Sequence, residues 1–257
     1  MSTPASVLDL FRLDGKTAWV TGGTKGLGYV MAEALAQAGA NVIVTSRTAG
    51  EASDKAATLA RTYGRTAFGV AADATDEAAA AAIVERAERE LGGIDILVNN
   101  AGTTVRKSSI EMPLADWKHV VDVNLNGPFI CSKAVLPGMI RKGWGRVVYI
   151  SSIFGLVGMP GRPGYVATKG AIAMLTKGQA LEVAKNGVTI NAICPGPFAT
   201  PMNKALLEDP VKYQEFVSKI PMGRWGELHE LPGLIVFLAS NASSYVTGTT
   251  IPLDGGW

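Results

Sequence analysis

The segment TAWVTGGTKGLG, residues 17–28, decides the fold class of this chain. Its first five residues form a short β-rich run, a glycine-rich turn follows directly, and residues 29–38 have the pattern of a helix. From residue 16 onward, similar β-rich runs alternate with longer helical stretches. This alternation is typical of a parallel sheet covered by helices on both faces, so we predict an α/β fold.

The glycine-rich turn predicts a phosphate site. Gly22, Gly26 and Gly28 would allow a tight turn, the approach of a phosphate to bare backbone, and close packing of helix against strand. The N–H groups at the helix start would then point at a pyrophosphate. The spacing departs from G-x-G-x-x-G, and an ordinary loop is the alternative reading. The order of strand, turn and helix favours phosphate binding.

The end of the next strand, residues 41–45, indicates which dinucleotide is bound. In dinucleotide-binding folds this strand end faces the adenosine ribose, where an acidic residue would select NAD through the 2′-hydroxyl. The chain has Ser46 and Arg47 there instead, and Lys25 lies in the glycine turn. Two cations suit a 2′-phosphate, so we expect NADP(H) rather than NAD(H). The alternative is that both are ordinary solvated charges.

The composition excludes several classes of function. Lys and Arg number 24 against 22 Asp and Glu, a formal net charge of +2, which gives no electrostatic case for a nucleic-acid or membrane partner. Residues 1–10 lack the features of a signal peptide, so we expect a cytoplasmic protein. Cys131 and Cys194 suit reduced, buried thiols. His119 and His229 have no Cys or carboxylate at ligand spacing, so we predict no metal site.

Tyr165, Lys169 and Ser152 are the candidate chemical groups. Tyr165 and Lys169 are four residues apart, which on a helix places an ammonium beside a phenol. Lowering a tyrosine pKa from ~10 to about 7 takes roughly 4 kcal/mol, and a neighbouring cation acts in that direction. Ser152 follows the apolar run 146–150, at the carboxyl end of a predicted strand, where ligands bind in open α/β sheets. An amphipathic surface pair is the alternative for Tyr165 and Lys169.

Further motifs occur at other predicted strand ends. Asn99-Asn100-Ala101-Gly102 follows the run 94–98, and its amides could tie neighbouring strands together. The helical stretch 113–141 is interrupted near Asn124, where a carboxamide could hold a backbone bend or a water. Pro195 and Gly196 follow the run 188–193 and should turn the chain out of the sheet, into a long segment typical of a lid.

Together these motifs resemble the classical short-chain dehydrogenase/reductase family over nearly the full chain. They are Thr21-Gly22-x-x-x-Gly26-x-Gly28, Asn99-Asn100-Ala101-Gly102, Asn124, Ser152, Tyr165-x-x-x-Lys169 and Pro195-Gly196, in that order. The resemblance implies one doubly wound, Rossmann-type domain over 1–257 with about seven parallel strands. It also implies an N-terminal extension, 1–14, a substrate-binding lid, 198–226, and a homotetramer.

The resemblance also implies residue roles. Tyr165 would exchange the proton, Ser152 would bind the substrate oxygen, and Lys169 would lower the tyrosine pKa and hold the nicotinamide ribose. Asn124 would position a water in the proton relay, and Asp73 would meet the adenine. The expected cofactor-binding residues are Gly22, Thr24, Lys25, Gly26, Leu27, Gly28, Ser46, Arg47, Asp73, Ala74, Asn100, Ala101, Gly102, Tyr165, Lys169, Pro195, Gly196, Phe198 and Thr200.

The expected substrate is a small anionic alcohol or ketone. Arg106 and Arg162 lie near the motifs, where either could clamp a carboxylate, although Arg106 could equally be a solvated surface arginine. Segments 204–209 and 223–226 resemble the gluconate 5-dehydrogenase branch of the family, which implies a sugar acid or polyol. The alternatives are a 3-oxoacyl-[acyl-carrier-protein] reductase, a general carbonyl reductase, or a non-catalytic dinucleotide sensor, although the sensor predicts loss of a catalytic residue. The expected substrate residues are Arg106, Ser152, Arg162, Tyr165 and Met202.

Overall fold

A seven-stranded parallel sheet forms the centre of the protein, in the order β3-β2-β1-β4-β5-β6-β7. The structure is a computed structural model that describes residues 6–200 and 203–257. The strand order reverses beside β1, so the carboxyl ends of β1 and β4 flank a switch point where ligands bind in such sheets. The prediction of a single doubly wound Rossmann-type fold is confirmed. The strands are β1 Thr17–Thr21, β2 Asn41–Ser46, β3 Ala67–Ala71, β4 Ile96–Asn99, β5 Gly145–Ile150, β6 Val188–Pro195 and β7 Thr250–Leu253.

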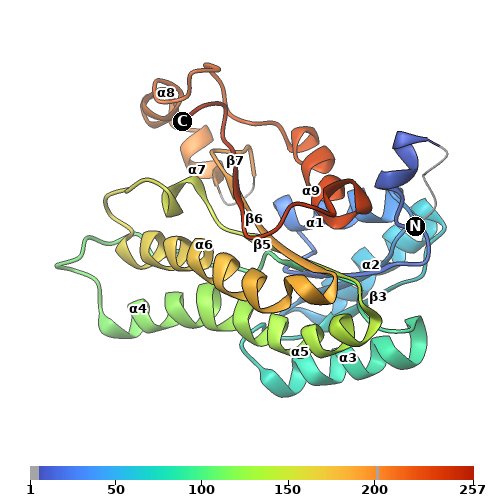
Figure 1. Ribbon diagram of the computed structural model, residues 1–257. Helices are drawn as coiled ribbons and strands as arrows, with labels where there is room; N and C mark the ends of the chain where they lie inside the picture. The colour runs from blue at the N-terminus through green and yellow to red at the C-terminus, as the bar shows by residue number, and fades with distance from the viewer. Residues whose placement is uncertain (1–5, 201–202) are drawn as a thin grey trace.

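Helices cover both faces of the sheet (Figure 1). Alternation along each strand divides the core: Ala18 and Val20 of β1 join the cluster under α1, α2 and α9, whereas Trp19 joins the cluster under α3, α5 and α6. The helices are α1 Gly26–Gln37, α2 Ala49–Tyr63, α3 Glu77–Leu91, α4 Leu114–Val121, α5 Gly127–Lys142, α6 Pro163–Val183, α7 Lys204–Leu207, α8 Pro210–Val217 and α9 Pro232–Ala239. Among the described residues, no helix has the length and apolar character needed to cross a membrane.

Two predicted boundaries next to the site are wrong. Helix α1 begins at Gly26, so Gly26 and Gly28 belong to its first turn rather than to the preceding loop. Strand β6 continues through Pro195, which pairs with Leu253 of β7. The proline is tolerated there because the next residue, Gly196, supplies the N–H that bonds the Leu253 carbonyl oxygen, at 2.9 Å.

The predicted interruption near Asn124 is a π-helical turn. Helix α4 continues into η2, Asp122–Asn126, and then into α5, with the N–H of Gly127 bonded to the carbonyl oxygen of Asp122. Such turns insert one residue into a helix and are frequent at functional sites. The turn directs the buried Asn124 side chain at the loop that follows β4.

The described residues of segment 198–226 lie beyond the end of β6 and include α7 and α8. An isolated parallel bridge between Phe198 and Gly226 joins the two ends of the segment. Its side chains Phe216 and Trp225 pack with Phe154 in a third hydrophobic cluster. The aromatic ring of Trp257 contacts both phenylalanines, with 5.6 Å between ring centroids in each case.

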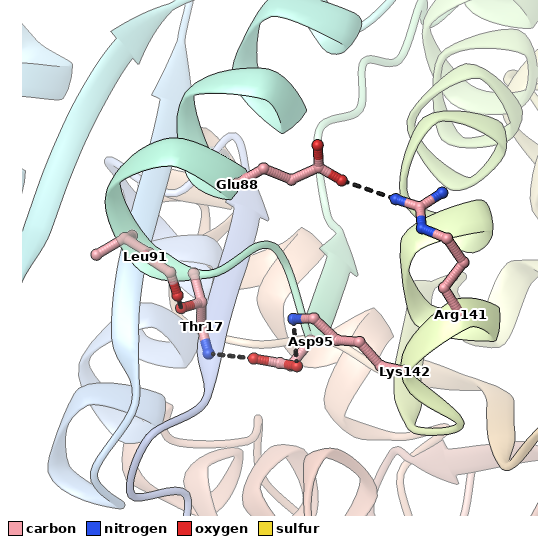
Figure 2. A network of polar contacts seen from close by, with 6 residues as sticks. All are labelled: Thr17, Glu88, Leu91, Asp95, Arg141 and Lys142. Atoms are coloured by element: carbon pink, nitrogen blue, oxygen red, sulfur yellow. Dashed lines mark hydrogen bonds and ion pairs between the residues drawn. The ribbon is translucent and has the colours of Figure 1, made fainter.

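A polar network closes the opposite end of the sheet (Figure 2). Asp95, only 6% exposed, accepts hydrogen bonds from the Thr17 backbone N–H at 3.0 Å and from Lys142 Nζ at 2.9 Å. These contacts join the starts of β1 and β4 to the end of α5. Beside them, Arg141 forms an exposed ion pair of 2.9 Å with Glu88.

Candidate active site

An elongated groove runs along the carboxyl ends of the strands. One part, a cavity of about 390 Å³, contains Ser152 and Tyr165, and a second part of about 330 Å³ contains Arg47 and Asp73. The two parts share lining residues in the glycine corner and the turn after β4, so they form one depression across the switch point. The shared residues are Gly22, Lys25, Ala101, Gly102 and Thr103.

The two turns at the middle of the groove are joined into one unit. Asn100 Nδ2 donates to the carbonyl oxygens of Thr21 and Gly22, both at 3.0 Å. The hydroxyl oxygen of Thr21 accepts from the backbone N–H groups of Asn100 and Ala101, also at 3.0 Å. The prediction that these amides tie strand ends together is confirmed for Asn100.

The glycine corner fits a pyrophosphate. A Cβ on Gly28 would collide with the Gly22 carbonyl oxygen and with Asn100 Nδ2, so only glycine allows this packing. Gly26 has a φ of +51°, the left-handed region that favours glycine. Lys25, the N-cap of α1, forms no side-chain cap, which leaves the first backbone N–H groups of the helix for a ligand.

The end of the groove beside β2 and β3 contains the residues predicted for the adenosine. Asp73 accepts hydrogen bonds from the Thr75 backbone N–H at 2.9 Å and the Thr75 hydroxyl at 2.8 Å, and these bonds lower the pKa of its carboxyl group. Lys25 Nζ lies 3.0 Å from the carboxylate of Glu51, which comes from the first turn of α2. Glu51 is not among the predicted site residues, because an acidic residue was expected only at the end of β2 itself.

Ser152 and Lys169 both line the groove at the carboxyl end of β5. Lys169, on α6 and 5% exposed, donates from Nζ to the Ile150 carbonyl oxygen at 2.7 Å. The hydroxyl of Ser151 donates to the Lys169 carbonyl oxygen at 2.7 Å, and Ser152 follows directly. Tyr165 lies one turn earlier on α6, with its ring centroid 5.6 Å from Lys169 Nζ. The predicted juxtaposition of Ser152, Tyr165 and Lys169 is therefore present.

The electrostatics differ from the expectation. Burial raises the pKa of Tyr165, and a hydrogen bond with Ser152 and the charge of Arg162 lower it only in part. Burial also lowers the pKa of Lys169, to about 8. The predicted lowering of the Tyr165 pKa by Lys169 is wrong for the polypeptide by itself, because the ammonium is bonded to backbone and desolvation of the phenol dominates.

Asn124 lies behind the groove rather than in its lining. Its Oδ1 accepts from the Thr103 N–H at 2.8 Å, and Nδ2 donates to the Thr103 carbonyl oxygen at 2.9 Å and the Thr168 hydroxyl at 3.2 Å. Both Nδ2 hydrogens are thus used to hold the loop after β4 against α6. A water positioned by Asn124 would have to be held elsewhere on that residue, and this role stays a prediction.

The cavity beside Tyr165 carries positive charge. Arg106 and Arg162 both line it, and no Asp or Glu occurs among its described lining residues. Burial lowers the pKa of Arg162, and the charge of Arg106 lowers it further, so the two guanidinium groups act on each other. Apolar side chains complete the wall, none of them among the predicted site residues: Phe154, Leu206, Phe216 and Trp225.

All the predicted cofactor residues line the groove. Those in the part with Ser152 are Gly22, Lys25, Gly26, Leu27, Gly28, Asn100, Ala101, Gly102, Tyr165, Lys169, Pro195, Gly196, Phe198 and Thr200. The others, in the part with Glu51, are Thr24, Ser46, Arg47, Asp73 and Ala74. The predicted substrate residue Met202 lies outside the described residues.

Comparison with known proteins agrees with this geometry. A family model described as Enoyl-(Acyl carrier protein) reductase matches residues 22–257. The chain is 40% identical to gluconate 5-dehydrogenase of Gluconobacter oxydans (strain 621H), over 96% of each protein. It is also 40% identical to a 3-oxoacyl-[acyl-carrier-protein] reductase of Aquifex aeolicus (strain VF5), over 95% of this chain and 98% of the relative.

A solved structure extends the likeness to three dimensions. The gluconate 5-dehydrogenase from Burkholderia cenocepacia J2315, in complex with NADP and tartrate, superposes with a TM-score of 0.93 at 38% identity. The match covers 97% of this chain and 98% of that one. With the site geometry and these full-length matches, the chain belongs to the short-chain dehydrogenase/reductase family.

Proposed function

We propose that this chain is an NADP-dependent oxidoreductase that interconverts a secondary alcohol and a ketone on a sugar acid. The observation that carries the proposal is the placement of Ser152, Tyr165 and Lys169 between a glycine-cornered groove and a cavity with two guanidinium groups. Similarity to gluconate 5-dehydrogenases supports the substrate class.

The groove offers distinct contacts along the length of NADP(H). The first turn of α1 would bind the pyrophosphate, Arg47 and Lys25 the 2′-phosphate, and Asp73 the adenine side. Lys169 would hold the nicotinamide ribose, and Thr200 the carboxamide. When bound, NADP(H) supplies or accepts the hydride.

Tyr165 is the proposed proton donor for ketone reduction. Because burial raises its pKa, the phenol is neutral near pH 7 and can donate its proton to the substrate oxygen. The Ser152 hydroxyl, which hydrogen-bonds the tyrosine, would also bind that oxygen and stabilise the charge that develops on it. In alcohol oxidation the same phenol oxygen would take the proton back.

The two arginines favour an anionic substrate. A carboxylate can accept paired N–H groups from a guanidinium, and it would relieve the repulsion between Arg106 and Arg162. The second candidate is a 3-oxoacyl-[acyl-carrier-protein] reductase, favoured by a relative of equal identity and by the apolar wall formed by Phe216 and Trp225. Segment 198–226 supplies that wall, and we propose that it is the substrate-binding lid of a single domain.

We further propose a cytoplasmic homotetramer. Apolar side chains are exposed on α5 and α6, including Met174 at 63% and Leu181 at 84%, and an interface between copies of this chain would cover them. Cys131 and Cys194 are free and buried, as suits a reducing compartment. The molar mass measured by light scattering after size-exclusion chromatography should be four times that of one chain. A molar mass equal to that of one chain would contradict the tetramer.

A substrate panel tests the function. The decrease of NADPH absorbance should be fastest with 5-ketogluconate, compared with an acetoacetyl thioester and simple ketones. Arg162→Gln should raise KM for the keto acid about tenfold or more, the cost of a lost charged hydrogen bond, with little effect on a neutral ketone. Arg141→Gln, at an exposed site remote from the groove, is the matched control. Turnover of the thioester alone would reject the sugar acid, and no turnover of any substrate would favour the sensor.

A further inference from the structure

Glu51 lies at the capping-box position of α2 but does not cap the helix. The sequence Thr48-Ala49-Gly50-Glu51 has the S/T-x-x-E spacing of a capping box at the start of α2. That box is not formed: Thr48 makes no side-chain cap, and its backbone N–H donates to the Ser46 hydroxyl oxygen at 3.1 Å. The Glu51 carboxylate is therefore left for other partners.

Those partners come from the glycine corner. Lys25 Nζ lies 3.0 Å from Glu51 Oε1, and the Thr24 side chain acts on the same carboxylate. Both contacts lower the pKa of Glu51, Lys25 most strongly, so the carboxylate is ionised near pH 7. The Glu51 side chain is 21% exposed while that of Lys25 is 73% exposed, so the pair spans the edge of the groove from α2 to the start of α1.

The pair lies in the part of the groove where the 2′-substituent of an adenosine ribose is expected. Lys25, Ser46, Arg47, Thr48 and Glu51 all line it. A 2′-phosphate needs the positive charges of Lys25 and Arg47. Glu51 forms an ion pair with Lys25, which neutralises that charge, and its carboxylate repels a phosphate dianion. A 2′-hydroxyl, in contrast, can donate a hydrogen bond to a carboxylate.

We infer that Glu51 is a determinant of cofactor specificity, which reduces the preference for NADP(H) over NAD(H) that Lys25 and Arg47 would otherwise give. The inference rests on the proposed binding of a pyridine dinucleotide in this groove. Its consequence is that the wild-type chain binds both cofactors. Arg47 strengthens the binding of NADP(H), and the Lys25–Glu51 pair weakens it.

Calorimetric titration of Glu51→Gln tests the inference without an activity assay. The ligands are NADP⁺, NAD⁺, and the fragments adenosine 2′,5′-bisphosphate and adenosine 5′-monophosphate, which isolate the 2′-phosphate. The variant should bind NADP⁺ and the bisphosphate at least about fivefold more tightly, a change of about 1 kcal/mol. Binding of NAD⁺ and the monophosphate should stay equal or weaken.

Asp54→Asn is the matched control, because it removes the same charge from the exposed face of α2, outside the groove lining. It should leave the ratio of the two dissociation constants unchanged. If thermal unfolding shows that Glu51→Gln does not fold, Glu51→Ala makes the same test with a strong helix former.

The outcomes separate the inference from the proposed function. An unchanged ratio in Glu51→Gln, or weaker binding of NADP⁺, would overturn the role of Glu51 while dinucleotide binding stands. Failure of the wild-type protein to bind either dinucleotide would overturn both.

Discussion

Lys169 Nζ donates a hydrogen bond of 2.7 Å to the carbonyl oxygen of Ile150, the last residue of β5. The Ser151 hydroxyl returns a bond of the same length to the Lys169 carbonyl oxygen. Gly155 allows this contact, since a Cβ there would lie 2.6 Å from the Lys169 carbonyl. Helix α6, which carries Tyr165, is thus fixed against the strand end that carries Ser152.

Replacing Lys169 with Met should therefore impair the site more than the fold. Turnover should fall by roughly 10²-fold, the cost of misplacing a reacting group, because Lys169 holds α6 and its Tyr165 against the end of β5. Loss of the hydrogen bond to the Ile150 carbonyl opposes stability, but Met also removes a buried cation that the native state disfavours, as its lowered pKa shows, so the unfolding free energy should change little. Steady-state kinetics and urea unfolding measure the two quantities. Lys177→Met, on the exposed side of α6, should change neither, and a fully active Lys169→Met would disprove the role.

The pH dependence of turnover follows from two pKa shifts. Tyr165, with a raised pKa, remains protonated through neutral pH, and Lys169, with a pKa near 8, is charged only below about that pH. Ketone reduction should therefore be level at low pH and decline above about pH 8, as the lysine loses its proton. Alcohol oxidation should increase with pH, because Tyr165 must accept a proton.

Profiles of kcat in both directions, with wild type and Lys169→Met, check these signs. The variant should lack the decline near pH 8. Reduction that accelerates from pH 6 to pH 9 would contradict a neutral tyrosine as the donor.

The sequence predicted the sheet and the catalytic centre because both depend on local patterns. Tyr165 and Lys169 are joined by helical spacing, and Ser152 is placed by the apolar run before it. The pKa of Tyr165 could not be predicted in this way, since it depends on burial that β5, α6 and segment 198–226 create together.

The adenosine end of the groove shows a second limit of sequence reasoning. Arg47 was found because strand β2 ends beside it, but Glu51 belongs to the following helix and reaches the groove only through the fold. Its S/T-x-x-E spacing indicates a capping box, which the Ser46 hydroxyl makes unnecessary. Competition between local partners thus concealed an acidic residue beside Lys25.

Gly28→Ala should distort the groove through a steric clash. The added methyl group would displace the Gly22 carbonyl or Asn100 Nδ2, and so break the link between the two turns. We expect dinucleotide affinity to fall at least about tenfold and stability to fall by about 1–3 kcal/mol, as for overpacking. Titration calorimetry and thermal unfolding measure these changes.

Gly178→Ala provides the comparison, because this glycine lies inside α6 with nothing within 4 Å of the new Cβ. It should stabilise the protein by about 0.5–1 kcal/mol through helix propensity and leave dinucleotide binding unchanged. Equal effects of the two substitutions would show that the packing of Gly28 has no special role.

The ion pair at the opposite end of the sheet should affect stability without affecting catalysis. Lys142→Met would leave the nearly buried Asp95 carboxylate with only the Thr17 N–H, at a cost of roughly 1–3 kcal/mol. Arg141→Met removes the neighbouring exposed pair with Glu88 and should cost less than about 1 kcal/mol. Urea unfolding of both variants should therefore separate them, while kcat/KM stays at the wild-type value in each. Equal destabilisation by Arg141→Met and Lys142→Met would show that burial of Asp95 does not strengthen its ion pair with Lys142.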